Sequence, residues 1–523
     1  MRGAYDHFEN IVDGPERVKP GPHGWLGVLL LYSLTKLWFI FDVDLGKDEA
    51  VYWYWGQHLD ASYALLPFAL LKLAHALLPG HEWFLRLFWI SCGTWSIYLI
   101  YRLCRLYQLE HRASLWACAA FATCHWIWHT TSYLHPDAFL VGCWLLTLTW
   151  ARQALDDSSC SSFIKVGVAA GLTCLCKYSA AFLITGLFLW IIIALEGRAR
   201  WRALSYALIP CLIVISPLLY TLFDGAFYLP TTLSTLSRIG DMQPLPIRLL
   251  LFLISPLLFV SPLLLFLLYR AGILVALDLR RRLSADQLLI FLPGLCLLFG
   301  FAFFALFRGQ IKGNWILPAF LGLWPFAFAP RCLPLRSQAF LGLLLATALL
   351  YTLPIALGLK FPILGHRLND ALNNKALNAT YAALVAQPDR RREQSFSWTE
   401  RLCEYSGWQA WTAHVDAALS KEELSTTIPL LSTQYNITFA AAYYADPQRR
   451  YFTVDDPRFR DLTDFQRQAG PDFPRRVLYV GRSGSPLPAS LQTLYPSSQL
   501  LAVLPRTARG CPPVNYQIFL LLR

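Results

Sequence analysis

Residues 24–60 read GWLGVLLLYSLTKLWFIFDVDLGKDEAVYWYWGQHLD, a mainly apolar run followed at once by two adjacent carboxylates and a row of aromatic residues. The run from Gly24 to Val43 has the length of about 20 residues with which a helix crosses a bilayer. The polar residues 1–23 lack the charged start, apolar core and cleavage site of a signal peptide. We therefore expect the first span to remain as an anchor behind a cytoplasmic tail at 1–23.

The composition of the whole chain agrees with a membrane protein. Of its 523 residues, 56% are hydrophobic and only 15% are charged, and it holds 19 Trp and 24 Tyr. Soluble domains carry about 25% charged residues, and Trp and Tyr are enriched at membrane interfaces. This composition excludes a disordered chain and disfavours a soluble enzyme.

Further apolar segments follow the first span. They lie near 83–101, 113–131, 138–151, 164–178, 179–195, 203–222, 247–268, 287–307, 314–329 and 337–359. The pattern predicts a polytopic α-helical membrane protein of about eleven transmembrane helices over 24–359. The segment 44–83 is too long for a turn and too interrupted for another span, so we interpret it as an external loop.

Lys and Arg alternate between the loops, which gives the orientation. One set of loops is rich in basic residues, as at 102–112, 198–202 and 280–282, whereas the other holds only Lys47, Lys72, Lys177, Arg238, Arg308 and Lys312. The positive-inside rule places the rich set in the cytoplasm. An odd number of spans then puts residues 360–523 outside, which in a bacterium is the periplasm. The net charge of +12 is better explained by this topology than by nucleic-acid binding.

Residues 360–523 differ in composition from the rest. They carry 33 charged residues out of 164, against 45 out of 359 before them. Helical patterns near 370–386 and 406–419 and apolar strand patterns near 428–432, 477–481, 499–504 and 516–522 predict a small external α/β domain. Its two cysteines, Cys403 and Cys511, can pair in an oxidising compartment.

The adjacent acids Asp48 and Glu49 are the strongest chemical signal. A carboxylate just outside a span can take the proton from an acceptor hydroxyl or stabilise positive charge on a reacting sugar. The alternative is a solvated helix start, because acids favour the first turn of a helix. Tyr52 and His58 follow on the same predicted helix and would line a pocket.

Cations at the external ends of spans form a second group of candidates. Lys177, followed by Tyr178, ends an apolar run, and ionisable groups at membrane depth are usually paired or functional. Such cations can hold a phosphate, although they can also be snorkelling side chains. The remaining candidates are Arg238, the cluster of Arg308, Lys312, Asn314 and Trp315, and the turn that carries His135 and Asp137.

Other chemistries have no support in the sequence. It contains neither a phosphate loop nor a dinucleotide fingerprint, which disfavours a nucleotide-driven pump. No spacing of His, Asp and Glu specifies a metal, so no cofactor is assigned and a divalent metal stays open. External acids also disfavour a nucleotide-sugar donor, whereas a membrane lipid phosphate would fit.

Together these motifs resemble those of the GT-C class of membrane glycosyltransferases, within the dolichyl/polyprenyl-phosphate-mannose protein mannosyltransferase superfamily. Within this superfamily they look especially like the bacterial aminoarabinose-transferase-like branch, which modifies lipid A. The resemblance rests on the order of Asp48-Glu49-Ala50, Gln57-His58-Leu59-Asp60, Pro136-Asp137-Ala138, Gly171-Leu172 with Lys177-Tyr178-Ser179-Ala180, Ser255-Pro256, Asn314-Trp315, Gly407-Trp408 and Tyr443-Tyr444.

This resemblance implies a GT-C-like catalytic domain over 24–359 that acts at the external face. The donor would be an undecaprenyl- or similar polyprenyl-phosphate sugar, and the acceptor a glycolipid, a polysaccharide or a protein. Asp48 would be the catalytic acidic residue with Glu49 beside it, and Lys177 would contact the donor phosphate. The chain departs from the branch at 62–68, where Tyr63 and Pro67 are kept but Leu66 takes the place of a basic residue.

Two other functions are compatible with the sequence. A transporter or flippase of lipid-linked sugars would show broken spans in two matching halves, and no such repeat is found. A non-catalytic glycan-binding membrane protein would keep the outer domain but not the chemistry, which the change at Leu66 would permit.

Overall fold

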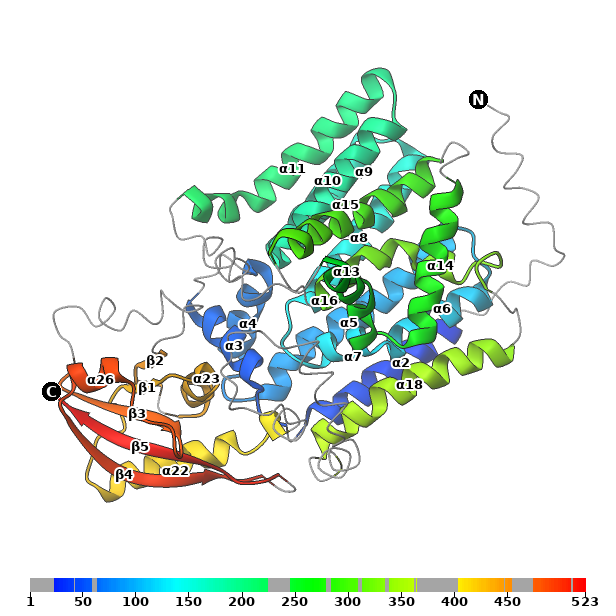
Figure 1. Cartoon of the computed structure of the whole chain (residues 1–523). Coiled ribbons are helices and arrows are strands. Elements are labelled where there is room, and N and C mark those ends of the chain that lie inside the picture. The colour runs from blue at the N-terminus through cyan, green and yellow to red at the C-terminus, as the bar shows by residue number, and fades with distance from the viewer. Residues whose placement is uncertain are drawn as a thin grey trace.

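Figure 1 shows the computed structural model, in which helices occupy the first two thirds of the chain and a sheet with helices occupies the end. The structure describes residues 23–41, 43–58, 64–223, 245–278, 284–308, 313–333, 338–361, 364, 403–445, 447–453, 474–508 and 511–523. The helical elements before the sheet are α2 (His23–Ile40), α3 (Lys47–His58), α4 (Leu65–Leu77), α5 (Glu82–Leu106), α6 (His111–Thr123), α7 (His125–Ser132), α8 (Asp137–Asp157), α9 (Cys160–Cys176), η2 (Tyr178–Ala180), α10 (Ala181–Ala194), α11 (Gly197–Phe223), α13 (Leu245–Ile254), η3 (Ser255–Leu258), α14 (Pro262–Asp278), α15 (Ala285–Arg308), α16 (Gly313–Ile316), η4 (Leu317–Leu323), α17 (Trp324–Ala327) and α18 (Gln338–Lys360).

Among the described residues, five helices are long and apolar enough to cross a membrane. They are parts or all of α5, α8, α11, α15 and α18. Shorter apolar helices of 10–17 residues stand at several other predicted spans, including the first. The mainly helical membrane architecture is confirmed, whereas the count of eleven spans is not.

Prolines divide two of the predicted spans. The segment predicted as one helix over 247–268 is split into α13, η3 and α14, with Pro256 in the first turn of η3 and Pro262 at the start of α14. The segment 314–329 consists of α16, η4 and α17, where Pro318 and Pro325 stand in first turns. Proline lacks an N–H and is best accommodated in the first turn of a helix, and each of these residues stands at the start of a new element.

The predicted span over 113–131 is also divided, but without proline. It breaks at Cys124 into α6 and α7, and the N–H of Trp126 bonds to the carbonyl oxygen of Phe259 at 2.9 Å instead of continuing the helix. The predicted external loop 44–83 contains two helices, α3 and α4, which contact each other. The site described below is built on the first of them.

Small residues let two helices approach closely. Gly167 and Gly171 stand four residues apart on α9, and a methyl group added to Gly167 would lie 2.1 Å from the carbonyl oxygen of Ala207 on α11. Glycines at this spacing favour close helix contact in membranes, where burying apolar surface gives little drive. The pair holds α9 against α11 and so fixes the helix that ends directly before Lys177.

The C-terminal part contains a five-stranded sheet in the order β2-β1-β3-β5-β4. Strands β1 and β2 are parallel, as are β1 and β3, whereas β5 is antiparallel to both β3 and β4. The elements are η5 (Cys403–Tyr405), α22 (Trp408–Lys421), β1 (Leu430–Ser432), α23 (Tyr435–Tyr444), β2 (Tyr451–Thr453), β3 (Arg476–Arg482), α26 (Ala489–Leu494), β4 (Ser497–Arg506) and β5 (Val514–Leu522). The four predicted strands and the predicted helix near 406–419 are confirmed, and the helix predicted near 370–386 lies outside the described residues.

The two faces of this sheet belong to different apolar clusters. Side chains that alternate along β3 and β5 contact α26 on one face, through Leu491 and Tyr495. The other face joins α22, through Trp408 and Trp411, in the same core cluster as the membrane helices. Alternation along a strand puts successive residues on opposite faces, which is how one short strand serves both clusters. The C-terminal part is therefore continuous with the helical part through buried side chains.

A disulfide joins Cys403 and Cys511, whose Cα atoms lie 5.9 Å apart. It connects η5 with the residues just before β5. The bond closes a loop of 108 residues. Cross-linking so long a loop restricts the unfolded chain strongly.

We expect the double substitution Cys403→Ala with Cys511→Ala to lower stability by about 2–5 kcal/mol, the usual cost of losing a native disulfide. The measurement is thermal unfolding of the detergent-purified protein. Cys160→Ala, at a free and half-buried cysteine, is the matched control and should leave the transition in place. An unchanged transition in the double variant would contradict the prediction.

Candidate functional site

The acidic pair lies at the first turn of α3, directly after α2 ends. Asp48 and Glu49 are the second and third residues of α3. Glu49 accepts the backbone N–H of Gly46, the residue before the helix, at 2.9 Å. This back-bond is one half of a capping box and satisfies an N–H that the helix itself cannot. Acids in this turn also interact favourably with the positive end of the helix dipole.

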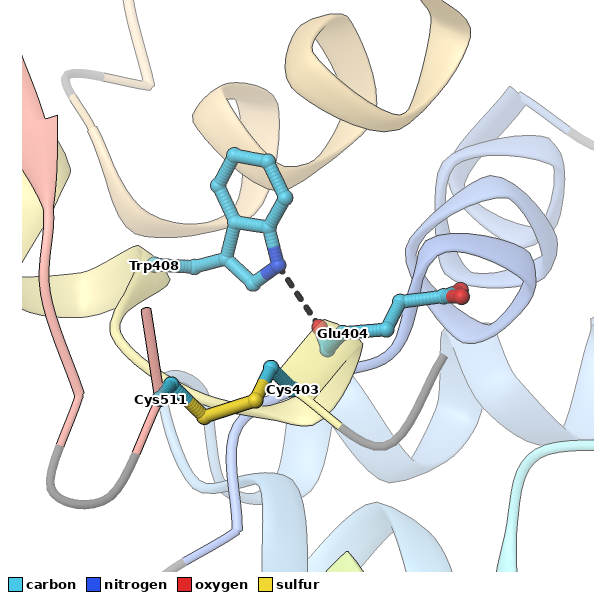
Figure 2. Close-up of a disulfide and its surroundings, with 4 residues drawn as sticks. All are labelled: Cys403, Glu404, Trp408 and Cys511. Carbon is cyan, nitrogen blue, oxygen red and sulfur yellow. Dashed lines mark hydrogen bonds between the residues drawn. A yellow bond between two sulfur atoms is a disulfide. The ribbon is translucent and has the colours of Figure 1, made fainter. Parts of the chain in front are cut away.

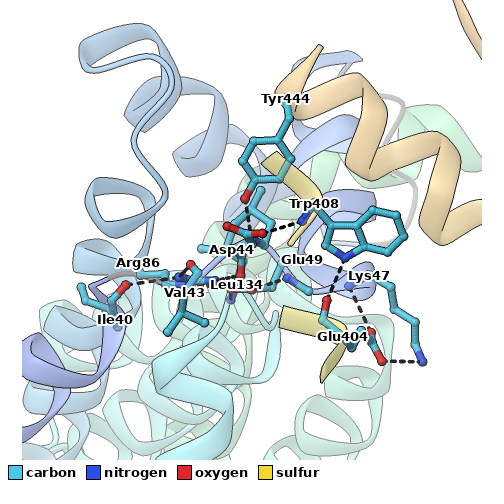
Figure 3. A network of polar contacts seen from close by, with 12 residues as sticks. Ile40, Val43, Asp44, Lys47, Glu49, Arg86, Leu134, Glu404, Trp408 and Tyr444 are labelled. Carbon is cyan, nitrogen blue, oxygen red and sulfur yellow. Dashed lines mark hydrogen bonds and ion pairs between the residues drawn. The ribbon is translucent and has the colours of Figure 1, made fainter. Parts of the chain in front are cut away.

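Glu49 is buried and paired, as Figure 3 shows. Arg86 on α5 donates from Nε to Oε1 at 3.0 Å and from Nη2 to Oε2 at 2.7 Å, a two-pronged contact. The same guanidinium donates to the carbonyl oxygens of Val43 at 2.6 Å and Asp44 at 2.8 Å. Arg86 therefore holds both the segment after α2 and the start of α3. The negative charge of Glu49 offsets the cost of burying the Arg86 guanidinium.

Asp48 has the opposite environment. Its side chain is exposed, and its Oδ1 accepts a hydrogen bond from the hydroxyl of Tyr435 on α23 at 3.2 Å. Two adjacent acids thus divide into a buried residue that holds the turn and an accessible residue that can meet a substrate. Of the pair, the contacts favour Asp48 for chemistry and give Glu49 a positioning role.

A second polar cluster lies at the start of α8. The Asp137 carboxylate is fully buried and accepts a hydrogen bond from Lys177 Nζ at 2.7 Å. Its other oxygen lies 3.5 Å from Nδ2 of Asn314 and 3.7 Å from Nδ1 of His135. Four residues that the sequence analysis singled out on three distant segments therefore come together around one carboxylate.

The two clusters are connected. Glu49 Oε1 accepts the backbone N–H of Leu134 at 2.9 Å, which fixes the turn that leads to Asp137. The ring of His135 makes an edge contact with the ring of Tyr52 on α3, with 6.0 Å between centroids. The backbone carbonyl oxygen of His135 accepts a hydrogen bond from Trp89 Nε1 at 2.8 Å. The first turn of α3 and the start of α8 are thus parts of one site.

The other predicted site residues fall as follows. Tyr178 begins η2 directly after Lys177, and Trp315 packs against Phe301 with ring centroids 5.8 Å apart. Both are half-buried. The residues Arg238, Lys312 and Tyr63 lie outside the described residues, as do the side chains of His58 and Arg308. The roles proposed for this last group stay predictions.

Tyr405 and Tyr444 of the C-terminal part also reach the site, and burial changes the acidity of both tyrosines and of Asp44. Removal from water raises the pKa of the Asp44 carboxyl above its usual range, an effect that the N–H of Trp408 opposes and the charge of Glu82 reinforces. Burial likewise raises the pKa of the Tyr405 and Tyr444 hydroxyls, so both tyrosines stay neutral. Neutral hydroxyls here act as hydrogen-bonding groups rather than as bases.

The arrangement offers an accessible carboxylate for proton transfer and a buried ammonium for binding an anion. Within the part of the chain that the structure describes, no three His, Cys, Asp or Glu side chains gather as a metal site would require. The chemistry that these residues support is transfer of a group to a hydroxyl, with a carboxylate as base and cations that stabilise the leaving group.

Known proteins share this architecture. Residues 62–220 match the family model described as dolichyl-phosphate-mannose-protein mannosyltransferase. The solved structure of ArnT from Cupriavidus metallidurans bound to undecaprenyl phosphate is 16% identical, covers 95% of this chain and 98% of its own, and superposes with a TM-score of 0.56. Its apo state gives 15% identity, the same coverage and a TM-score of 0.57. No curated protein sequence matches the chain.

The chain shares its fold with ArnT, a GT-C glycosyltransferase. The resemblance drawn from the motifs, including that to the ArnT-like branch, is confirmed. The near-complete coverage extends to the C-terminal part, so the sheet with its flanking helices belongs to the shared fold.

Two charged residues of the helical core escaped the sequence analysis. Arg86 lies inside the predicted span 83–101 and Lys36 inside the first span, and each is at most 1% exposed. Lys36 donates to the backbone of Trp128 and to Ser132 Oγ at 2.5 Å. Their position in apolar runs was a usable signal, because charges at membrane depth require partners. Tyr435 and Glu404, by contrast, carry no sequence signal.

We expect Glu49→Gln to destabilise the protein by about 3–5 kcal/mol, because it leaves the buried Arg86 guanidinium without a counter-charge. The double variant Glu49→Gln with Arg86→Met should recover part of this loss. Asp156→Asn removes an exposed partner of Arg152 and serves as a control that shifts stability by less than about 1 kcal/mol. A Glu49→Gln variant as stable as this control, in thermal unfolding, would show that the pair is not needed for folding.

Proposed function

We propose that this chain is a membrane glycosyltransferase that moves a sugar from a polyprenyl-phosphate donor to an acceptor hydroxyl. The observation that carries the proposal is that the accessible Asp48 adjoins Glu49 in the first turn of α3, and that Glu49 holds the backbone of Leu134, just before the buried cluster of Asp137, Lys177 and Asn314. The ArnT fold supports it, since one ArnT structure is bound to undecaprenyl phosphate.

In the proposed reaction, the acceptor oxygen attacks the anomeric carbon of the donor. Asp48 takes the hydroxyl proton, the bond between the sugar and the phosphate oxygen breaks, and the polyprenyl phosphate leaves with the bonding electrons. An accessible carboxylate suits this role because it must approach the acceptor within hydrogen-bond distance. Inversion at the anomeric carbon follows from a single displacement.

Lys177 is the residue proposed to stabilise the leaving phosphate. Its ammonium has three N–H donors, and Asp137 accepts one of them at 2.7 Å. The half-buried Leu66 of α4 stands where the family resemblance implies a basic residue, so in this proposal more of the phosphate charge falls to Lys177. Arg308 and Lys312 are further candidates for the same task.

The proposed setting is a bacterial inner membrane, with residues 1–23 in the cytoplasm and residues 360–523 in the periplasm. The helical part over 24–359 would be the catalytic domain. The acceptor would be a glycolipid such as lipid A, a polysaccharide or a protein. Because the site lies beside the C-terminal part, donor and acceptor would meet at the outer face.

The test is incubation of the purified protein with radiolabelled polyprenyl-phosphate sugars and candidate acceptors. An enzyme releases polyprenyl phosphate and labels the acceptor. In proteoliposomes, a flippase would only relocate the intact donor, and a glycan-binding protein would only retain it. Either of the last two results would overturn the proposal, and mass spectrometry of glycans from a deletion strain would identify sugar and acceptor together.

A further inference from the structure

The chain segment that leads into the acidic turn is held by residues far away in the sequence. The backbone N–H groups of Asp44, Leu45 and Lys47 all bond to residues beyond position 403. The carbonyl oxygen of Tyr405 accepts from Asp44 at 3.1 Å, the hydroxyl of Tyr444 from Leu45 at 2.7 Å, and Oε1 of Glu404 from Lys47 at 3.1 Å. Only Gly46, between them, bonds within the turn, to Glu49.

Glu404 contributes with both of its carboxylate oxygens. While Oε1 accepts the backbone N–H of Lys47, Oε2 lies 3.0 Å from the Lys47 ammonium (Figure 3). Lys47 is the first residue of α3, and its backbone N–H has no partner within the helix. Glu404 therefore acts as a cap for α3 that is supplied from the C-terminal part of the chain.

The segment that carries Glu404 is itself fixed. The Cys403–Cys511 disulfide lies directly before Glu404. The carbonyl oxygen of Glu404 accepts a hydrogen bond from Trp408 Nε1 at 2.8 Å, as Figure 2 shows. The backbone N–H of Trp408 donates to Asp44 Oδ2 at 2.7 Å. The ring of Tyr405 packs on Gly46, where an added methyl group would lie 2.2 Å from it. No side chain larger than hydrogen fits at that point of the turn.

Helix α23 of the C-terminal part also contacts α3. It packs against α3 through Trp53 and Tyr443, with ring centroids 4.9 Å apart, and through Tyr54 and Phe439 at 5.0 Å. At its start, Tyr435 donates to Asp48 itself. The C-terminal part thus contacts the acidic turn at its backbone, at its helix start and at the proposed catalytic oxygen.

We propose that Glu404 is a positioning residue for Asp48, so that the outer part of the chain is a working component of the active site. This inference rests on the proposed glycosyltransferase function. Glu404 sets the first turn of α3, and the direction of that turn sets where the Asp48 carboxylate meets the acceptor. Small misplacements of a reacting group are costly, about 10²-fold in rate for roughly 1 Å.

The test compares three variants. Glu404→Ala removes the acceptor for the Lys47 N–H and should lower kcat about 10–100-fold, with the KM for the donor within about twofold of wild type. Glu404→Gln keeps an acceptor oxygen but no charge, and Lys47→Ala keeps the backbone bond but no ammonium. Both should stay within about threefold of wild-type kcat, because both keep the hydrogen bond from the Lys47 backbone N–H to the side chain of residue 404.

Folding is checked by non-reducing thiol counting and thermal unfolding, which should find the disulfide formed and the transition close to wild type in all three variants. Equal kcat values for Glu404→Ala and Glu404→Gln would overturn the proposal. A rise in the donor KM alone would also overturn it, because that result would assign Glu404 to donor binding.

Hydrogen exchange of the peptide that covers residues 44–49 provides a readout independent of turnover. The Lys47 amide should exchange faster in Glu404→Ala than in wild type and in Glu404→Gln. Unchanged exchange would contradict the capping contact. If the wild-type protein transfers no sugar, the proposed function fails, and this exchange measurement still decides whether Glu404 holds the turn.

Discussion

Asp48→Asn should abolish most sugar transfer while leaving the protein folded in the membrane. Asparagine has nearly the same shape and can still accept the hydrogen bond from Tyr435, but its amide cannot take a proton from the acceptor. Loss of a general base lowers rates about 10²–10⁴-fold. The measurement is the initial rate of label transfer from a polyprenyl-phosphate sugar at saturating donor.

The control for this prediction is Asp156→Asn. Asp156 lies at the far end of α8, 19 residues from Asp137 and so roughly 28 Å along the helix from the site. It should transfer at the wild-type rate. Full transfer by Asp48→Asn would remove Asp48 from the catalytic role and direct attention to Asp137, the other carboxylate of the site.

Lys177→Met should lower both the stability of the protein and the rate of sugar transfer. The fully buried Asp137 carboxylate would lose its ammonium partner, and breaking a buried pair in this way costs about 3–5 kcal/mol. Transfer should also be lost, because the departing phosphate would lack its proposed cation.

A double variant separates these two effects. Lys177→Met with Asp137→Asn leaves no unpaired charge and should regain most of the stability, as measured by thermal unfolding. It should not regain transfer. If the double variant were both stable and active, the Lys177 and Asp137 pair would be structural only, and the phosphate would have to be bound by other cations.

The sequence predicted the membrane class, the C-terminal α/β part and most of its strands, because each of these depends on local periodicity and composition. Prediction failed where a helix breaks without a strong local signal, as at Cys124, where the backbone N–H of Trp126, two residues on, bonds to Phe259 instead. The predicted count of spans was also affected by prolines, because an apolar run was taken as one helix although prolines divide it into shorter elements.

The candidate site was predictable to a similar extent. Lys177, His135, Asp137 and Asn314 were each selected for residue type and position at the ends of spans, and the structure brings them together. Arg86 was missed although a charge inside an apolar run is a signal. Glu404 and Tyr435 could not be found, because nothing local marks a glutamate or tyrosine that caps or contacts a helix lying more than 350 residues away.

By itself, the sequence determined that an acidic turn follows the first apolar helix, because chain order and hydrophobic length require no distant contact. Only the tertiary structure decided that Glu49 is buried and Asp48 accessible. Neighbouring residues on a helix point about 100° apart, so one of the two had to face Arg86 and the core while the other faced away. Which one did so depends on how α5 and the C-terminal part pack around α3, and that packing is set by residues distributed over the whole chain.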